Sequence, residues 1–189
     1  MTDLFLLGFF AVFLLFGLKR PFLWVCLYLY VDILAPQKMG YGPIISVPVS
    51  LIAFAAAFGG WLMLDKRTRP TFTFRQAIML FLLVWAWFTM QGAQFPISAH
   101  EKWDWVWKTL VFAIFLPFTV TTRLRFEAAA LVMLLTAGAI IISGGVKTVL
   151  GGGGYGTLAL FVNDNSGIYE SSTLSTVAIA IIPLIYWFT

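Results

Sequence analysis

Charged residues are scarce in this chain, and their scarcity limits the classes of protein to which it can belong. Asp, Glu, Lys and Arg together make up 11% of the 189 residues, whereas hydrophobic residues make up 61%. An ordinary soluble domain has about 25% charged residues. A water-soluble fold of this size buries only about two thirds of its surface, so it could not hide this much apolar side chain. The composition therefore predicts a membrane protein.

Cysteine and histidine each occur only once. Cys26 lies inside an apolar stretch, so neither a disulfide within the chain nor a cysteine zinc site is expected. His100 has no second histidine at a metal-ligand spacing. We predict no metal site and no cofactor. The net charge of +4 does not indicate nucleic acid, because the basic residues lie at the ends of apolar stretches, where anionic lipid accounts for them.

Seven apolar stretches, separated by short polar junctions, occupy the chain from end to end. A helix needs about 20 residues to cross the hydrocarbon core of a bilayer. The predicted fold is all-α: a single membrane domain over residues 1–189, built as a polytopic transmembrane bundle of about seven helices. The stretches are Leu4–Leu18, Phe22–Ala35, Ile44–Leu64, Ala77–Met90, Val106–Val120, Ala128–Ile142 and Leu174–Phe188. Pro117 and Pro183 are expected to kink their helices, and Pro48 lies near the start of the third.

The orientation in the membrane follows from the distribution of Lys and Arg, which gather on the cytoplasmic side. The odd junctions hold Lys19, Arg20, Lys66, Arg67, Arg69, Arg75, Arg123 and Arg125, and the even junctions hold Lys38, Lys102, Lys108 and Lys147. This distribution favours an external N-terminus and places the even junctions on the outer face.

The junction Gln91–Lys108 contains three tryptophans, at positions 103, 105 and 107. Pro96 and Ser98 favour the start of a helix, on which Trp103 and Trp107 share a face while Trp105 points away. Two interpretations stay open: an aromatic belt that anchors the helix at the bilayer surface, and a platform on which sugar rings stack.

The same junction holds the densest group of titratable side chains, His100, Glu101 and Asp104. Positions 100 and 104 fall on one face if the helix starts early. The group could act as an acid–base pair, or it could be a solvated start of a helix.

The glycine-rich junction Ser143–Ser172 is predicted to be a long loop, a length at which loops are often functional. Backbone amides of Gly151, Gly152, Gly153 and Gly154 could bind a phosphate, with Lys147 as the nearby cation. The alternative is a flexible hinge, since the Gly-Lys-Ser/Thr ending of a nucleotide-binding loop is missing.

Three further acidic residues are candidates for polar sites. Asp32 is the only acid well inside an apolar stretch, where it either interacts with a substrate or proton or caps the end of its helix. Asp164 and Glu170 lie in the long loop, where a turn is the alternative to a site.

An ordered series of motifs resembles the exosortase-A-associated O-glycosylation ligases, which are relatives of the bacterial O-antigen ligases and polymerases. The resemblance covers essentially the whole chain. It rests on Lys19–Trp24 (KRPFLW), Ala35–Lys38 (APQK), Glu101–Lys108 (EKWDWVWK), Ser143–Lys147 (SGGVK), Gly151–Gly156 (GGGGYG), Asp164–Gly167 (DNSG) and Glu170–Thr173 (ESST).

The resemblance implies a multi-pass enzyme of the bacterial inner membrane that transfers a glycan from an undecaprenyl pyrophosphate carrier to an acceptor at the periplasmic face. Lys147, the glycine amides, Lys102 and Lys108 are then candidates to bind the pyrophosphate. Family members are roughly twice as long, and their catalytic histidine and arginines lie in the second half, so no catalytic residue is assigned here. The end at Trp187-Phe188-Thr189, within an apolar stretch, predicts a cut in the middle of a protein.

The function predicted from the sequence is therefore the N-terminal membrane portion of an O-glycan or polysaccharide ligase, not catalytic alone. Its expected partners are the lipid bilayer, the undecaprenyl-pyrophosphate-linked glycan and the missing C-terminal half. The alternatives are a non-enzymatic membrane assembly protein and a transporter of a small substrate, the latter favoured by Asp32 and the kinked helices.

Overall fold

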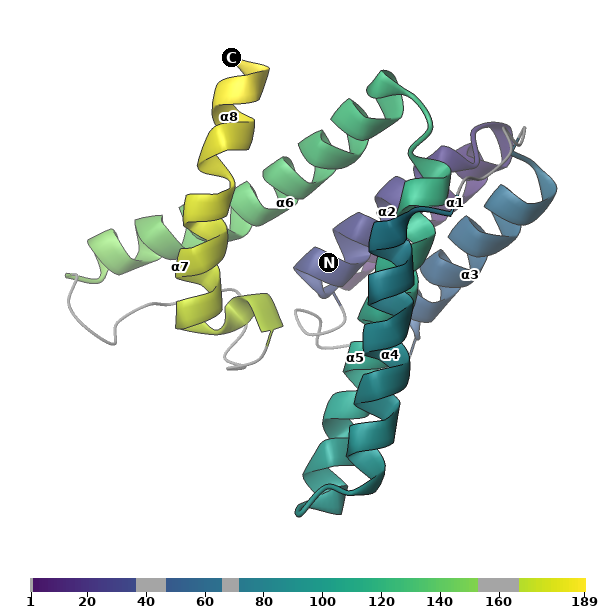
Figure 1. Ribbon diagram of the computed structural model, residues 1–189. Helices are drawn as coiled ribbons and strands as arrows, with labels where there is room; N and C mark the ends of the chain where they lie inside the picture. Colours follow the sequence, from purple (N-terminus) through teal and green to yellow (C-terminus); the bar gives the residue numbers. More distant parts are fainter. Residues whose placement is uncertain (1, 37–46, 66–71, 153–166) are drawn as a thin grey trace. The chain divides into compact units, whose positions relative to one another are not determined.

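The structure, a computed structural model, describes residues 2–36, 47–65, 72–152 and 167–189 (Figure 1). These residues form helices, turns and short connections, and no strand occurs among them. The all-α prediction is therefore confirmed for the part of the chain that is described. The chain divides into two compact units, one of residues 1–65 and 126–189 and one of residues 66–125.

The first unit contains α1 (Thr2–Lys19), α2 (Phe22–Leu34), α3 (Val49–Met63), most of α6 (Arg123–Leu150), the short 3-10 helix η3 (Gly167–Tyr169), α7 (Ser171–Ala180) and α8 (Ile182–Phe188). The second unit contains α4 (Phe74–Gln91) and α5 (Pro96–Thr119), which run side by side in opposite directions (Figure 1).

Within the first unit, α2 packs against both α1 and α3. Its residue Trp24 fills the space between glycines of the two neighbouring helices, because a Cβ added at Gly17 of α1 or at Gly60 of α3 would collide with the indole ring. The indole Nε1–H donates a hydrogen bond of 2.8 Å to the carbonyl of Leu14. Small residues thus let the three helices approach closely, as is common in helix packing within membranes.

A second cluster in this unit joins α2, α6, η3 and α7 through Leu34, Ile140, Tyr169 and Leu174. The Tyr169 hydroxyl donates a hydrogen bond of 2.6 Å to the carbonyl of Leu34, the last residue of α2. This bond satisfies a carbonyl that has no intrahelical donor at a helix end.

The helices agree with the apolar stretches of the sequence except at three places. The seventh stretch is two helices, because α7 ends at Ala180 and α8 begins at Ile182, next to Pro183. Pro117 lies inside α5 as expected, whereas Pro48 precedes α3 and does not kink it. The predicted loop Ser143–Ser172 was wrong at its start, since α6 continues as a helix to Leu150 and includes Lys147 in its last turn.

Two of the described helices, Phe74–Gln91 and Arg123–Leu150, are long and apolar enough to cross a membrane. The apolar segments Leu4–Lys19, Phe22–Leu34, Val49–Met63 and Ser172–Phe188 are shorter. By length and composition the structure therefore offers two candidate spans among the residues it describes.

Candidate functional site

The α4–α5 pair is held together at one end by Gln76, a polar side chain that is only 1% exposed. Its amide Nε2 donates a hydrogen bond of 2.9 Å to the carbonyl of Ile114 in α5. Its Oε1 accepts a hydrogen bond of 2.8 Å from the backbone N–H of Thr73, and the Thr73 side chain caps the start of α4 in return. Gln76 thus takes part in the cap at the start of α4 and also forms a hydrogen bond that links α4 to α5.

Pro117 lies inside α5 close to this contact. Proline has no N–H and its ring opens the preceding turn of a helix. The turn before Pro117 contains Ile114, whose carbonyl accepts the bond from Gln76. Beyond the proline, the carbonyl of Thr119 accepts a hydrogen bond of 2.9 Å from Arg125 Nη1. Polar groups therefore satisfy the backbone around the end of α5.

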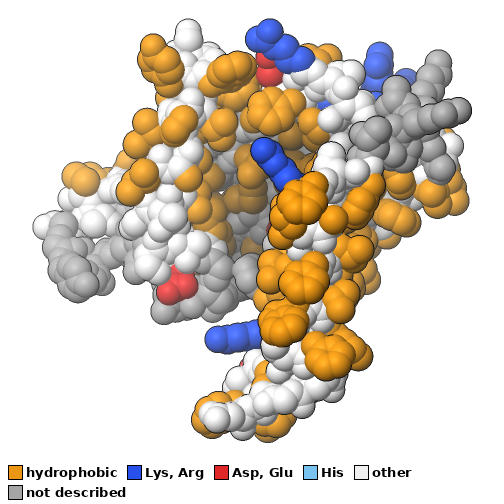
Figure 2. Space-filling view, viewed as in Figure 1, with side chains coloured by type: hydrophobic (Ala, Val, Ile, Leu, Met, Phe, Trp, Pro, Cys, Tyr) orange, Lys and Arg blue, Asp and Glu red, His pale blue; other side chains and the backbone are white. Residues whose placement is uncertain are grey.

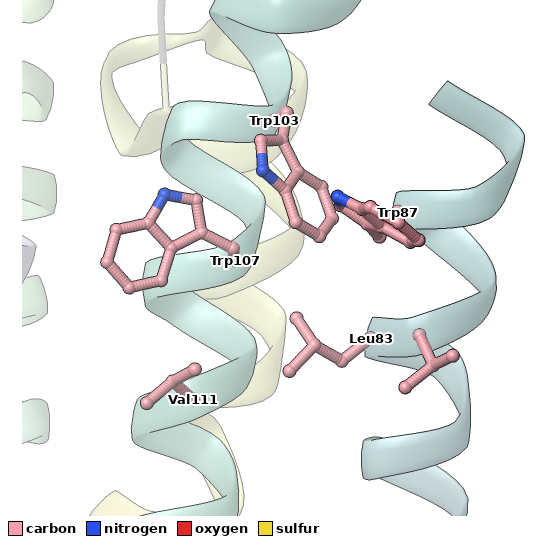
Figure 3. A pocket seen from close by; sticks show the side chains of 6 residues that line it. Leu83, Trp87, Trp103, Trp107 and Val111 are labelled. Carbon is pink, nitrogen blue, oxygen red and sulfur yellow. The ribbon is translucent and has the colours of Figure 1, made fainter. Parts of the chain in front are cut away.

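Farther along the same helical hairpin, α4 and α5 line an open groove of about 360 Å³ (Figure 3). Trp103 reaches from α5 towards Trp87 of α4, and Trp107 lies one turn farther along α5. Three of the lining side chains are aliphatic and three are indoles. The lining residues are Leu83, Val84, Trp87, Trp103, Trp107 and Val111.

One basic side chain, that of Lys108, lies beside a groove residue. Lys108 Nζ lies 5.7 Å from the centre of the Trp107 ring, within the range of a cation–π interaction. Lys102 is exposed and directly precedes Trp103 in α5. The structure thus brings two of the predicted pyrophosphate-binding residues, Lys102 and Lys108, to the same helix as the groove indoles.

Two of the three titratable residues of this region, His100 and Glu101, are exposed. His100 Nδ1 lies 3.0 Å from the carbonyl of Pro96, one turn earlier, and Glu101 is exposed. The side chains of Asp104 and Trp105 lie outside the described residues, so the predicted pairing of His100 with Asp104 stays a prediction. Within the part of the chain that is described, no group of three His, Cys, Asp or Glu side chains gathers in a metal-binding arrangement.

The predicted glycine site begins at the C-terminal end of α6. Gly151 N–H donates to the carbonyl of Lys147 at 2.9 Å, and Gly152, with a φ of +91°, donates to the carbonyl of Val149 at 3.3 Å. These two amides close the helix, as glycines do at helix C-termini. A helix C-terminus carries a partial negative charge, which disfavours an anion. Gly153 and Gly154 lie outside the described residues.

Asp32 lies on α2 with an exposed side chain, two residues before the end of the helix. The Tyr28 hydroxyl, one turn earlier, forms side-chain hydrogen bonds with Asp32 and with Ser50 at the start of α3. The acid therefore belongs to a polar contact between two helices.

The remaining predicted acids lie before α7. The Glu170 carboxylate accepts hydrogen bonds from Ser172 Oγ at 2.9 Å and from Thr173 Oγ1 at 3.3 Å, so it orders the start of α7. Asp164 lies outside the described residues.

Tyr169, next to Glu170, has a raised pKa. Burial in the cluster around Leu34 raises the pKa of Tyr169 to about 12, with a smaller contribution from Tyr30. The hydroxyl that bonds Leu34 is therefore protonated at neutral pH.

Comparison with protein families gives one match, which extends over residues 1–189, to the family described as "Family of unknown function (DUF5935)". The chain belongs to DUF5935. No curated protein and no solved structure matches it.

For this DUF5935 chain, sequence reasoning missed half of the groove. Trp87, Leu83 and Val84 come from α4 and were treated only as part of an apolar stretch. A signal was present, since Leu83 and Trp87 are one helical turn apart, as are Trp103, Trp107 and Val111 on α5. The alignment of Trp103 with Trp107 was predicted correctly.

Proposed function

We propose that this chain is the N-terminal membrane portion of an O-glycan or polysaccharide ligase of the bacterial inner membrane. It crosses the bilayer several times and binds a glycan linked to undecaprenyl pyrophosphate at the periplasmic face. The transfer to an acceptor requires the C-terminal half, which supplies the catalytic residues.

The membrane part of the proposal is supported by the inverted polarity of α4. The buried residue of this helix is Gln76, whereas large apolar side chains such as Phe81, Trp85 and Phe88 are more than half exposed. Hydrophobic side chains cover the face of α4 that is turned to the viewer in Figure 2. Soluble proteins rarely expose such contiguous apolar surface. In lipid the same arrangement is favourable, because polar groups must be satisfied inside the protein.

The glycan-carrier part is supported by the position of the groove. Two of its lining residues, Trp103 and Trp107, belong to the junction Gln91–Lys108, which the distribution of Lys and Arg places on the outer side. An apolar groove with Lys108 next to one of its indoles suits a lipid that bears a phosphate. The resemblance of the motifs to O-glycosylation ligases supplies the identity of that lipid.

The test is deletion of the gene in the source bacterium, followed by mass spectrometry of lipid-linked glycans and of the glycosylated acceptor. We expect the undecaprenyl-pyrophosphate-linked glycan to accumulate and the acceptor to lose its glycan, and the full-length gene supplied in trans to reverse both. Unchanged acceptor glycosylation in the deletion strain would rule out the proposed function.

A transporter of a small polar substrate is the second candidate, because Asp32, Tyr28 and Ser50 form a polar contact between α2 and α3. A transporter predicts that Asp32→Asn abolishes substrate movement in vesicles while acceptor glycosylation in cells is unchanged. The ligase proposal predicts that glycan transfer depends on the gene and that no small substrate moves across vesicles.

A further inference from the structure

We infer that the groove between α4 and α5 binds the hydrocarbon chain of a polyprenyl phosphate carrier, with its phosphate next to Lys108. This inference rests on the proposed function and names the residues of its lipid site. The residues that would contact the chain are Leu83, Val84, Trp87, Trp103, Trp107 and Val111.

The lining of the groove selects a hydrocarbon. Its six side chains are aliphatic or aromatic, and the indole N–H groups are their only side-chain polar atoms. A sugar ring would bury several hydroxyl groups against this lining, and a buried hydroxyl without a partner is costly. A branched hydrocarbon loses nothing in the same place and gains contact with the indole faces. The groove therefore suits the chain of the carrier rather than its glycan.

The groove is open to the side from which a lipid would enter. Val84 and Trp87 line it and are also 53% and 47% exposed, so their outer edges face the surroundings of the hairpin. The hydrogen bond from Gln76 to Ile114 ties the hairpin at its opposite end. A chain can thus enter between the helices at the indole end without separating them at the other.

Charge complementarity sets the polarity of the bound lipid. Lys108 Nζ lies over the Trp107 ring, at the border of the groove, and Lys102 is exposed on the same helix. A lysine binds phosphate as a point charge, and the attraction is stronger at a bilayer interface than in water because the effective dielectric constant is lower. The exposed carboxyl of Glu101 opposes an anion nearby, which makes Lys108 the more important of the two lysines.

The experiment uses the full-length protein in phosphatidylcholine nanodiscs with an undecaprenyl phosphate analogue that carries a photoreactive group on its chain. Crosslinked peptides are mapped by mass spectrometry, and binding is titrated with undecaprenyl phosphate as competitor. We expect crosslinks in residues 83–111. Val111→Trp, which fills the groove, should weaken binding by at least about tenfold, as should Trp87→Ala, which removes one wall. Trp85→Ala is the matched control, since Trp85 lies on the same helix but does not line the groove.

The charge is tested with Lys108→Gln and with undecaprenol, which lacks the phosphate. The substitution should lower the affinity for undecaprenyl phosphate and leave that for undecaprenol unchanged. The inference is overturned if Val111→Trp and Trp87→Ala bind like the wild type, or if Trp85→Ala weakens binding as much as they do. It is also overturned if phosphatidylglycerol competes as well as undecaprenyl phosphate, because the groove is then an ordinary bilayer-lipid site.

The two proposals fail separately. If the groove variants bind the carrier as the wild type does in nanodiscs, while gene deletion abolishes glycosylation of the acceptor in cells, the groove inference is wrong and the ligase proposal stands. If gene deletion leaves glycosylation intact, the ligase proposal is wrong whatever the groove binds.

A control is needed for the folding of Val111→Trp, which is checked by size-exclusion chromatography. Val84→Trp is a second variant that fills the groove, and it lies at a half-exposed position of the rim.

Discussion

The helices α2 and α4 both consist largely of apolar residues, yet their surroundings differ. Eight of the 13 residues of α2 are buried, because α1 and α3 enclose it. Among the 18 residues of α4 only Gln76 is buried. Composition alone does not distinguish a helix that packs against protein from one whose apolar side chains stay exposed. What distinguishes them here is where the small and the polar residues stand.

In α2 the contacts depend on shape. Trp24 is buried because Gly17 and Gly60 leave room for its ring, and its N–H reaches a carbonyl of α1. In α4 the contact depends on polarity, since Gln76 supplies the hydrogen bonds that join it to Thr73 and Ile114. Four substitutions test this contrast.

The largest effect is expected from a charge in the middle of α4. Phe81 is 65% exposed, so in water Phe81→Lys would be tolerated, whereas in lipid it should raise the apparent free energy of insertion by about 3 kcal/mol. Phe74→Lys, at the end of the same helix, is the control, because a lysine there reaches the interface. Insertion is measured as the glycosylated fraction of tagged protein in microsomes. Equal insertion of Phe81→Lys and wild type would show that α4 does not face lipid.

Next is the glycine contact of Trp24. Gly60→Ala should lower the free energy of unfolding by up to about 3 kcal/mol, because the added methyl group meets the indole. Its neighbour Gly59 has nothing within 4 Å of an added Cβ, so Gly59→Ala should gain up to about 1 kcal/mol from helix propensity. Thermal unfolding in detergent measures both. If the two variants shift stability in the same direction, Trp24 does not set the helix spacing.

Gln76→Leu tests the polar contact of α4. The change leaves the Ile114 carbonyl and the Thr73 N–H without their partner and should cost about 2 kcal/mol of unfolding free energy. Gln91→Leu, at the exposed end of α4, should stay within about 0.5 kcal/mol of the wild type. Hydrogen exchange of peptides from α4 and α5 reports whether the hairpin loosens. Unchanged exchange in Gln76→Leu would contradict a structural role for the glutamine.

The smallest effect is expected for Tyr169→Phe, which keeps the ring in its cluster and removes the hydrogen bond to Leu34, at a cost of about 1 kcal/mol. The pKa of Tyr169 is raised by burial from 10.0 to about 12, so the hydroxyl stabilises the fold fully below pH 10 and loses that contribution as the pH rises through 12. The stability difference between wild type and Tyr169→Phe should therefore shrink in alkaline unfolding curves. A constant difference up to pH 12 would show that the bond is not made.

Much of the helical pattern was predictable because hydrophobicity and proline act locally. Six apolar stretches correspond to helices of the structure, and Pro183 lies in the first turn of α8, just after the break from α7. The extension of α6 through Gly144 and Gly145 was not predicted, since paired glycines suggest a loop in a soluble protein. The glycines are tolerated where tertiary contacts support the helix, and Gly144 is indeed buried.

The candidate site was only partly predictable for a different reason. Trp103, Trp107 and Lys108 are near one another in the sequence, so their shared helix could be foreseen. The contribution of α4 depends on which residues meet across the hairpin, and that register is set by the contact of Gln76 with Ile114, 38 residues away. Nothing local to Trp87 reveals it.

The same contact has a consequence for how the protein is made. Of the two candidate spans, α4 is the less hydrophobic, and it carries a primary amide whose acceptor in α5 is synthesised later. In the proposed membrane protein, the Nε2–H group of Gln76 would enter lipid before its acceptor in α5 is synthesised, and an unsatisfied polar group is costly there. We expect α4 to wait at the translocation channel until α5 emerges, so that the two helices leave for the bilayer together as one hairpin.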